Sequence, residues 1–178
     1  MTTCHVFIAT SLDGFVARTD YGLDWLNRFN TSDEDHGYEE FVAGVNGLVM
    51  GRGSYETVLS FDDWPYRKPV VVMSKSLAEV DIPAELEGKV RLTRLEPSEL
   101  MRELDDEGWR RAYVDGGRLV QSFLREGLIA DLTITTVPVL IGSGIRLFGE
   151  LTEDVRLELV RSQAFGSGLV QSHYRVVD

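Results

Sequence analysis

The sequence predicts an α/β fold built on a mixed, mostly parallel sheet. Short apolar runs recur along the chain, and such runs are typical of strands buried on both faces. Several of them are followed by a glycine turn and a helical pattern, which is the order of a parallel strand–turn–helix unit. Near the C-terminus, apolar and polar residues alternate on both sides of the turn 166–168, which predicts an antiparallel hairpin.

The composition is that of a globular protein. The 178 residues suit a single domain spanning 1–178, and a hydrophobic content of 43% supplies one core. The net charge of −11 disfavours nucleic acid and anionic membranes as partners, because both need a basic surface. A small molecule that carries phosphate remains compatible, since a local basic pocket can exist in an acidic protein.

Cysteine and histidine usage narrows the chemistry further. Cys4 is the only cysteine, so we expect a buried thiol, a reducing compartment and a cytoplasmic location. We expect neither a signal peptide nor a membrane span, because no apolar stretch approaches about 20 residues. The three histidines lack the spacing of metal ligands, so no metal site is predicted.

The first predicted strand covers residues 5–10 and is apolar almost throughout, so we expect it in the centre of the sheet. It ends at a polar break that contains Ser11 and Asp13, and strand character resumes at 15–17. Ligands of α/β sheets bind at the carboxyl ends of strands, which makes Asp13 a candidate functional residue. The alternative is a plain turn, because aspartate before glycine is common there.

A helix is predicted after residue 37, because Tyr38, Phe41, Val42 and Val45 recur on one helical face. The acidic residues before it suit the positive end of the helix. A buried carboxylate at this place would have a different use. It could hold a protonated ring nitrogen or supply a proton.

The stretch 47–56 is the one around which the chain is organised. A short apolar run turns at Gly51-Arg52-Gly53 and enters a helix that we expect Ser54 to cap. Free backbone N–H groups at such a turn favour phosphate, and Arg52 adds a positive charge. The Gly-Lys-Ser/Thr ending of a P-loop is missing. A tight turn with a surface arginine is the structural alternative.

Two later strand ends repeat this pattern. The run 70–73 ends at Ser74 and Lys75, and the run 112–114 ends at 115–118, before the helical pattern 119–124. Paired glycines let a ligand approach the backbone closely. Two strand–glycine–helix turns in one parallel sheet favour a dinucleotide, although the Gly-x-Gly-x-x-Gly fingerprint is absent from the sequence.

The remaining elements complete the predicted sheet. A helix runs from Pro97 to a stop at Gly108, and a strand at 132–137 ends before Pro138. A glycine-rich loop at 142–144 follows this strand. The C-terminal hairpin then ends the pattern.

Five motifs occur together in order: SLDGFVA (11–17), VMGRGSYE (49–56), VMSKS (72–76), VDGGRL (114–119) and PVLIGSG (138–144). In this order they resemble the dihydrofolate reductase superfamily, and most closely a bacterial branch similar to the C-terminal reductase domain of the riboflavin-biosynthesis deaminase/reductase. The resemblance covers nearly the whole chain. It implies a dihydrofolate-reductase-like, three-layer α/β/α fold with a mixed, mostly parallel central sheet, and it implies a homodimer.

The resemblance also implies NADPH as the hydride donor. Its phosphates would be held by Gly51, Arg52 and Ser54, and its 2′-phosphate would lie near Ser74 and Lys75. The nicotinamide would be flanked by Ala9 and Val16. The turn over the pyrophosphate would consist of Asp115, Gly116, Gly117, Arg118 and Leu119.

On the substrate side, the resemblance places Ser11 and Asp13 at the reacting molecule. True dihydrofolate reductases grip the pteridine with a carboxylate on the first helix, and Asp35 and Glu39 are the nearest candidates here. Asp13 is our first candidate for proton transfer and Asp35 the second. The implied activity is reduction of a pterin- or pyrimidine-like metabolite, as by 5-amino-6-(5-phosphoribosylamino)uracil reductase. Dihydrofolate reductase activity and a non-catalytic, NADP-binding dimer are the alternatives.

Overall fold

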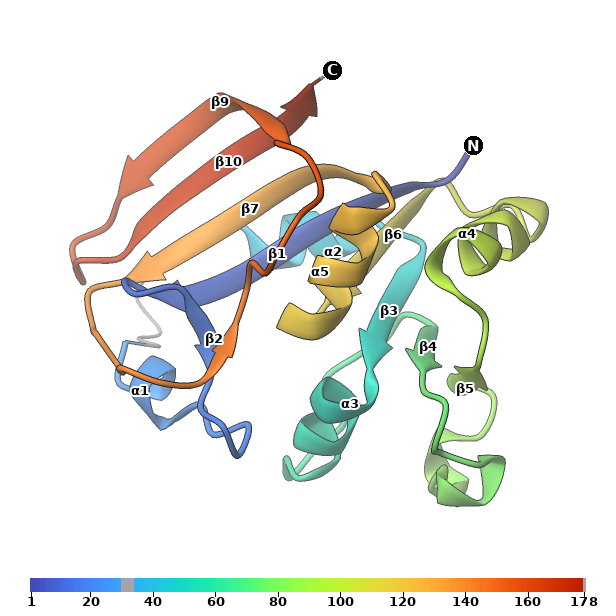
Figure 1. Cartoon of the computed structure of the whole chain (residues 1–178). Helices are drawn as coiled ribbons and strands as arrows, with labels where there is room; N and C mark the ends of the chain where they lie inside the picture. Colours follow the sequence, from blue (N-terminus) through green and yellow to red (C-terminus); the bar gives the residue numbers. More distant parts are fainter. Residues whose placement is uncertain (30–33, 178) are drawn as a thin grey trace.

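The computed structural model describes residues 1–29 and 34–177 and centres on an eight-stranded sheet of order β5-β4-β3-β6-β1-β7-β10-β9 (Figure 1). Pairing is parallel from β5 to β7, and β10 is antiparallel to both β7 and β9. The strands are β1 (Thr3–Ser11), β3 (Gly47–Gly51), β4 (Val70–Met73), β5 (Val90–Thr93), β6 (Arg111–Asp115), β7 (Ile129–Val137), β9 (Arg156–Ala164) and β10 (Val170–Val177). The mostly parallel sheet, the central first strand and the C-terminal hairpin are therefore confirmed.

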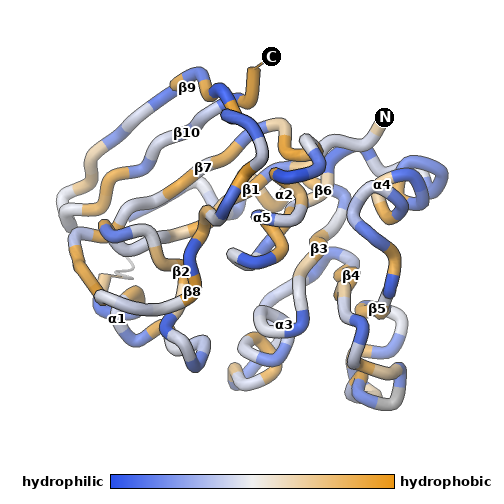
Figure 2. The backbone as a smooth tube through the Cα atoms, in the orientation of Figure 1, coloured by the Kyte–Doolittle hydropathy of each residue, from blue (hydrophilic) through white to orange (hydrophobic). Residues whose placement is uncertain are grey.

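Helices cover both faces of this sheet. The helices α4 (Pro97–Asp106) and α5 (Gly117–Arg125) contribute to one core cluster, and α2 (Tyr38–Ala43) and α3 (Arg52–Leu59) contribute to the other. Both faces need cover because successive side chains of a strand point to opposite faces of the sheet. In β3, Val49 packs in the first cluster, and Leu48 and Met50 pack in the second. Figure 2 shows β4 as a hydrophobic segment next to the largely polar outer turns of α4. The predicted three-layer α/β/α architecture is confirmed.

Two helices begin directly at strand ends without a side-chain cap. Helix α3 starts at Arg52 after the extended residue Gly51 (φ −82°, ψ 170°), so the prediction that Ser54 caps it was wrong. Ser54 is the third helical residue, because the strand leads into the helix with no intervening turn. Helix α5 follows Gly116, whose φ of 99° favours glycine.

Shorter elements close the edges of the fold. Strand β2 (Phe15–Ala17) pairs antiparallel with β8 (Ile145–Arg146), within the loop region expected to be glycine-rich. Helix α1 (Asp24–Asn27) lies between β2 and α2 in the chain, and two 3₁₀ turns occupy Glu79–Asp81 and Ala84–Leu86. None of the described helices is long and apolar enough to cross a membrane.

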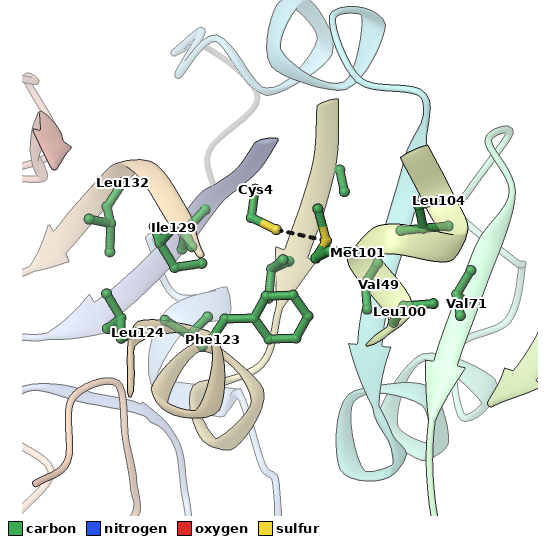
Figure 3. Packing of buried hydrophobic residues seen from close by; sticks show 14 of the residues in the cluster. Cys4, Val49, Val71, Leu100, Met101, Leu104, Phe123, Leu124, Ile129 and Leu132 are labelled. Carbon is green, nitrogen blue, oxygen red and sulfur yellow. Dashed lines mark hydrogen bonds between the residues drawn. The ribbon is translucent and has the colours of Figure 1, made fainter. Parts of the chain in front are cut away.

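The single thiol lies inside the first core cluster (Figure 3). The Sγ atom of Cys4 is 3.2 Å from the Sδ atom of Met101, and both side chains are buried. Burial raises the pKa of the Cys4 thiol to about 12, so the thiol stays protonated at neutral pH. The expectation of a buried thiol is confirmed.

Candidate functional site

A cavity of about 770 Å³ opens at the carboxyl ends of the central parallel strands. Strands β1, β3 and β6 bring Ala9, Gly51 and Asp115 to its wall, and β2 contributes Val16. A second cavity of about 410 Å³ lies beside β4, β5 and the start of α4. The two adjoin, because three side chains line both: Met73, Leu119 and Ser122.

The structure brings together the residues predicted to bind the cofactor. Ser74 and Lys75 line the smaller cavity. The others line the larger one: Ala9, Val16, Gly51, Arg52, Ser54, Asp115, Gly116, Gly117, Arg118 and Leu119. Turns separated by more than sixty residues thus meet because their strands are parallel neighbours in the sheet.

The N-termini of α3 and α5 both face the larger cavity, and neither has a side-chain cap. Their first N–H groups are therefore available to an anion. Glycine is required beside them, because a Cβ on Gly117 would lie 2.5 Å from the carbonyl oxygen of Arg146. This close-packed, amide-lined wall fits the phosphates of a dinucleotide.

The basic side chains of the two cavities differ in how they are engaged. Arg52 donates from Nε to Glu56 at 2.6 Å and from a terminal nitrogen to Ser76 at 2.9 Å. Lys75 donates to Glu96 at 2.6 Å. Within the described ranges, the exposed Arg118 side chain makes no ion pair. Arg118 is therefore the unpaired cation of the larger cavity, and Arg94 and Arg125, which line the smaller cavity, also make no ion pair with the described residues.

Asp115 is a carboxyl group in an aromatic corner of the larger cavity. Desolvation by the surrounding protein raises the pKa of Asp115 to about 6, although the Gly116 N–H and the Tyr113 hydroxyl favour its charged form. Tyr66 and Tyr113 also line the cavity, and burial raises the pKa of both phenols. Near neutral pH this corner holds hydroxyl donors and a carboxyl group that can take or release a proton.

Sequence reasoning missed Tyr66, Tyr113 and the other aromatic residues of the cavity. Tyr113 lies within an apolar strand, and Tyr66 lies in a loop between prolines, so neither is part of a motif. Their hydroxyl groups become candidate functional groups only because they lie close to Asp115. That proximity depends on the folded chain.

The predicted substrate residues of the first loop lie elsewhere. Asp13 accepts hydrogen bonds from the Ser11 hydroxyl at 2.6 Å and from the backbone N–H groups of Ile141 and Gly142 at 3.2 and 2.8 Å. These donors, the Ser11 hydroxyl foremost, lower the pKa of Asp13. Neither Ser11 nor Asp13 lines the two cavities. In this structure Asp13 ties the β1–β2 loop to the segment after β7.

The two carboxylates near the second helix are also outside the cavities. Asp35 is exposed and accepts a hydrogen bond from the Gly37 N–H at 2.8 Å, just before α2. Glu39 is exposed in the first turn of that helix. The described residues contain no cluster of three or more acidic, histidine or cysteine side chains that could hold a metal ion.

The sheet order and the cavity define a dihydrofolate-reductase-like α/β protein. The sequence profile of the RibD C-terminal domain matches residues 2–171, and the chain belongs to that family. The resemblance seen in the sequence is thereby confirmed.

Two proteins with substantial sequence identity share nearly the full length. The chain is 34% identical to the uncharacterized protein YwjB of Bacillus subtilis over 174 residues, covering 95% of each chain. It is 40% identical to a candidate riboflavin biosynthesis protein of known structure from Shewanella sp. PV-4. That match covers 99% of this chain and 100% of the other, with a TM-score of 0.93.

More distant structures share the fold. The deaminase/5-amino-6-(5-phosphoribosylamino)uracil reductase of Thermotoga maritima has 13% identity and a TM-score of 0.75, with 99% of this chain matching 57% of that one. Dihydrofolate reductase from Enterococcus faecalis, solved with NADP(H), has 16% identity and a TM-score of 0.68, covering 99% and 97%.

Proposed function

We propose that this protein is an NADPH-dependent reductase of a pterin- or pyrimidine-like metabolite, with an activity of the 5-amino-6-(5-phosphoribosylamino)uracil reductase type. One observation carries the proposal. Two uncapped helix N-termini open into the same cavity as a carboxyl group whose pKa is near neutrality. Family membership and the NADP(H)-bound neighbour support the cofactor. We place the activity in one domain spanning 1–178.

The proposed cofactor contacts follow the layout of the two cavities. The N-termini of α3 and α5 would hold the central phosphates, and Arg118 would supply the charge. Ser74 and Lys75 would meet the 2′-phosphate in the smaller cavity. Ala9 and Val16 would flank the nicotinamide. The bound dinucleotide would supply the hydride, and the chain would position the acceptor carbon and manage the proton.

Asp115 is the residue that we propose for proton transfer. Reduction of a C=N bond places a hydride on carbon and leaves the former π electrons on nitrogen, which then needs a proton. The protonated carboxyl group of Asp115 would donate it and be left as a carboxylate, to be reprotonated from water. Tyr66 would hold the ring by donating a hydrogen bond to a ring carbonyl oxygen. The Tyr113 hydroxyl already donates to the Phe7 carbonyl oxygen at 2.8 Å, so towards the ring it would act as an acceptor.

Asp13 and Asp35 are retained as the alternative proton-transfer residues, with Ser11 and Glu39 as their substrate-side neighbours. The Asp13 carboxylate would act by polarising the substrate, because its lowered pKa keeps it ionised at neutral pH. Either assignment requires these loops to reach the bound substrate. Substitution of each carboxylate separates the three possibilities.

The test measures NADPH oxidation with 5-amino-6-(5-phosphoribosylamino)uracil, its unphosphorylated form and dihydrofolate. We expect the wild type to oxidise NADPH with at least one ring substrate. Asp115→Asn should lose about 10²- to 10⁴-fold in kcat, while Asp13→Asn and Asp35→Asn should lose far less. Fastest turnover of dihydrofolate would identify a dihydrofolate reductase. NADPH binding without oxidation of any substrate would identify a non-catalytic, NADP-binding protein instead.

We also propose a homodimer that forms through the outer strands. Leu157 and Leu159 of β9 are 42% and 56% exposed, and their cross-strand partners in β10 are Val176 and Tyr174. Figure 1 draws no helix over this part of the sheet among the described residues. A second copy would cover this apolar face. The free buried thiol of Cys4 supports a reducing, cytoplasmic location.

A further inference from the structure

We infer that the natural substrate is an uncharged heterocycle whose side chain carries no phosphate. The inference rests on the proposed reductase function and narrows it: the ring type of 5-amino-6-(5-phosphoribosylamino)uracil is kept, and the phosphate of its side chain is absent. It follows from the side chains of the larger cavity that remain once the proposed dinucleotide contacts are set aside.

The remaining wall is aromatic and apolar. Phe7 comes from β1, Leu26 from α1, Phe61 from the end of the α3 segment, and Tyr21 and Tyr66 from loops. Such a wall suits the faces of a flat ring, because aromatic side chains offer large contact areas at low entropy cost. The polar side chains that remain are the hydroxyl groups of Tyr21, Thr57, Tyr66, Tyr113 and Ser122 and the carboxyl groups of Glu56 and Asp115. They match ring carbonyl and nitrogen atoms.

In the proposed function, both cations of this cavity contact the phosphates of the cofactor. In the described part of the chain, only Arg52 and Arg118 carry positive charge into its wall, each at the start of a helix. Arg52 is in addition paired with Glu56 at 2.6 Å. A substrate phosphate in the larger cavity would therefore lack a cation of its own, because the other basic side chains, Lys75, Arg94 and Arg125, line the smaller cavity. Charged groups enclosed without a partner are strongly disfavoured.

Acidic residues beside the cavity also disfavour a phosphorylated substrate. Phe61, on the cavity wall, is followed directly by Asp62 and Asp63, which are both exposed. The whole chain carries a net charge of −11. A neutral ring meets no electrostatic barrier here, whereas a phosphorylated one approaches a surface of its own sign.

The test compares two probes that differ only in the phosphate: 5-amino-6-(ribosylamino)uracil and its 5′-phosphate. With NADPH-loaded protein, we expect kcat/KM for the unphosphorylated probe to be higher by about tenfold or more. Isothermal calorimetry on the NADPH-loaded protein should show that the unphosphorylated probe binds more tightly than its 5′-phosphate. Each preference should be measured at low and moderate salt, because an electrostatic cause weakens as salt rises.

A designed cation makes the test sharper. Phe61→Lys places a positive charge on the cavity wall and should raise kcat/KM selectively for the phosphorylated probe. Phe148→Lys is the matched control, because Phe148 is similarly exposed (44% against 47%) and does not line the cavity. It should leave the preference unchanged.

The outcomes separate this inference from the proposed function. A wild type that reduces or binds the phosphorylated probe better overturns the inference and leaves a reductase. If NADPH binds but neither probe is reduced, the calorimetric order of affinity decides the inference. A protein that fails to bind NADPH overturns both proposals.

Discussion

The ammonium group of Lys75 lies 2.6 Å from a carboxylate oxygen of Glu96, at the edge of the smaller cavity. The proposed 2′-phosphate of the dinucleotide would need this same ammonium group. In the proposed complex, the Glu96 carboxylate would compete with the 2′-phosphate for Lys75. It also bears on whether the protein distinguishes NADPH from NADH.

Replacing Glu96 with glutamine should tighten NADPH binding and leave NADH binding nearly unchanged. We expect a decrease in the NADPH Kd of about threefold to tenfold, because one negative charge near the phosphate is removed. Fluorescence titration of both dinucleotides at low salt measures it. Glu103→Gln is the control, since Glu103 lies in α4, the helix that follows Glu96, and faces Arg91 at 3.4 Å. Equal effects of Glu96→Gln on the two dinucleotides would contradict the placement of the 2′-phosphate.

Replacing Asp115 with asparagine should lower activity and raise stability at the same time. The pKa of Asp115 is raised from 3.8 to about 6, so the folded protein binds this proton more tightly than the unfolded chain. Stability is therefore lost as pH rises from about 4 through 6, and asparagine escapes that loss. At pH 8 the variant should be more stable by about 3 kcal/mol, and near pH 4 the difference should vanish. Urea denaturation at both pH values checks this.

The same residue predicts the pH dependence of catalysis. If protonated Asp115 donates the proton, kcat/KM should fall as pH rises through about 6. The Asp115→Asn variant should show a flat profile in that range. A wild-type profile without a transition there would remove Asp115 from the proton-transfer step.

Two strand-end glycines should respond differently to alanine. At Gly117 a methyl group would meet the Arg146 carbonyl oxygen at 2.5 Å, so Gly117→Ala should cost about 1–3 kcal/mol of stability. At Gly51 the nearest atom, Leu119 Cβ, is 4.0 Å away, so Gly51→Ala should fold normally. Thermal denaturation with and without NADPH separates packing from ligand contact. A Gly51→Ala variant that keeps its stability and loses NADPH affinity would identify an approach point of the cofactor.

A charge on the outer strand should dissociate the proposed dimer. Leu159→Glu introduces a carboxylate on the exposed face of β9 and should weaken self-association by about tenfold or more. Sedimentation velocity over a range of concentrations measures this. Leu140→Glu is the matched control, because Leu140 is also exposed (69%) and lies in a different segment. Dimers that persist in Leu159→Glu would exclude this face as the interface.

The sequence was sufficient for the sheet and for the strand-end residues that gather along the two cavities. Runs such as 48–50 and 70–73 are apolar because both faces of their strands are covered, and a strand buried in this way reads directly from composition. The turn at Gly116 was recognisable because its φ of 99° favours glycine. The helix start at Arg52 was misplaced, since a strand that passes straight into a helix leaves no capping signal.

The substrate side could not be read in the same way. Asp13 is conspicuous in the sequence because it precedes a glycine, yet its carboxylate is engaged by backbone N–H groups from residues 141 and 142. The pKa of Asp115 is raised by desolvation, that is, by the burial of its carboxyl group in the folded protein. Residues that are distant in the sequence leave no local pattern when they surround a carboxyl group. Only the folded structure therefore shows which carboxyl group is buried and has a raised pKa.

The location of Cys4 offers a practical advantage for these experiments. Because the only natural thiol is enclosed and protonated, maleimide reagents should leave the native fold unlabelled. A cysteine introduced at an exposed position would then carry a single dye or spin label without any background substitution. Distances between such labels could follow assembly and cofactor loading in a protein whose core is otherwise untouched.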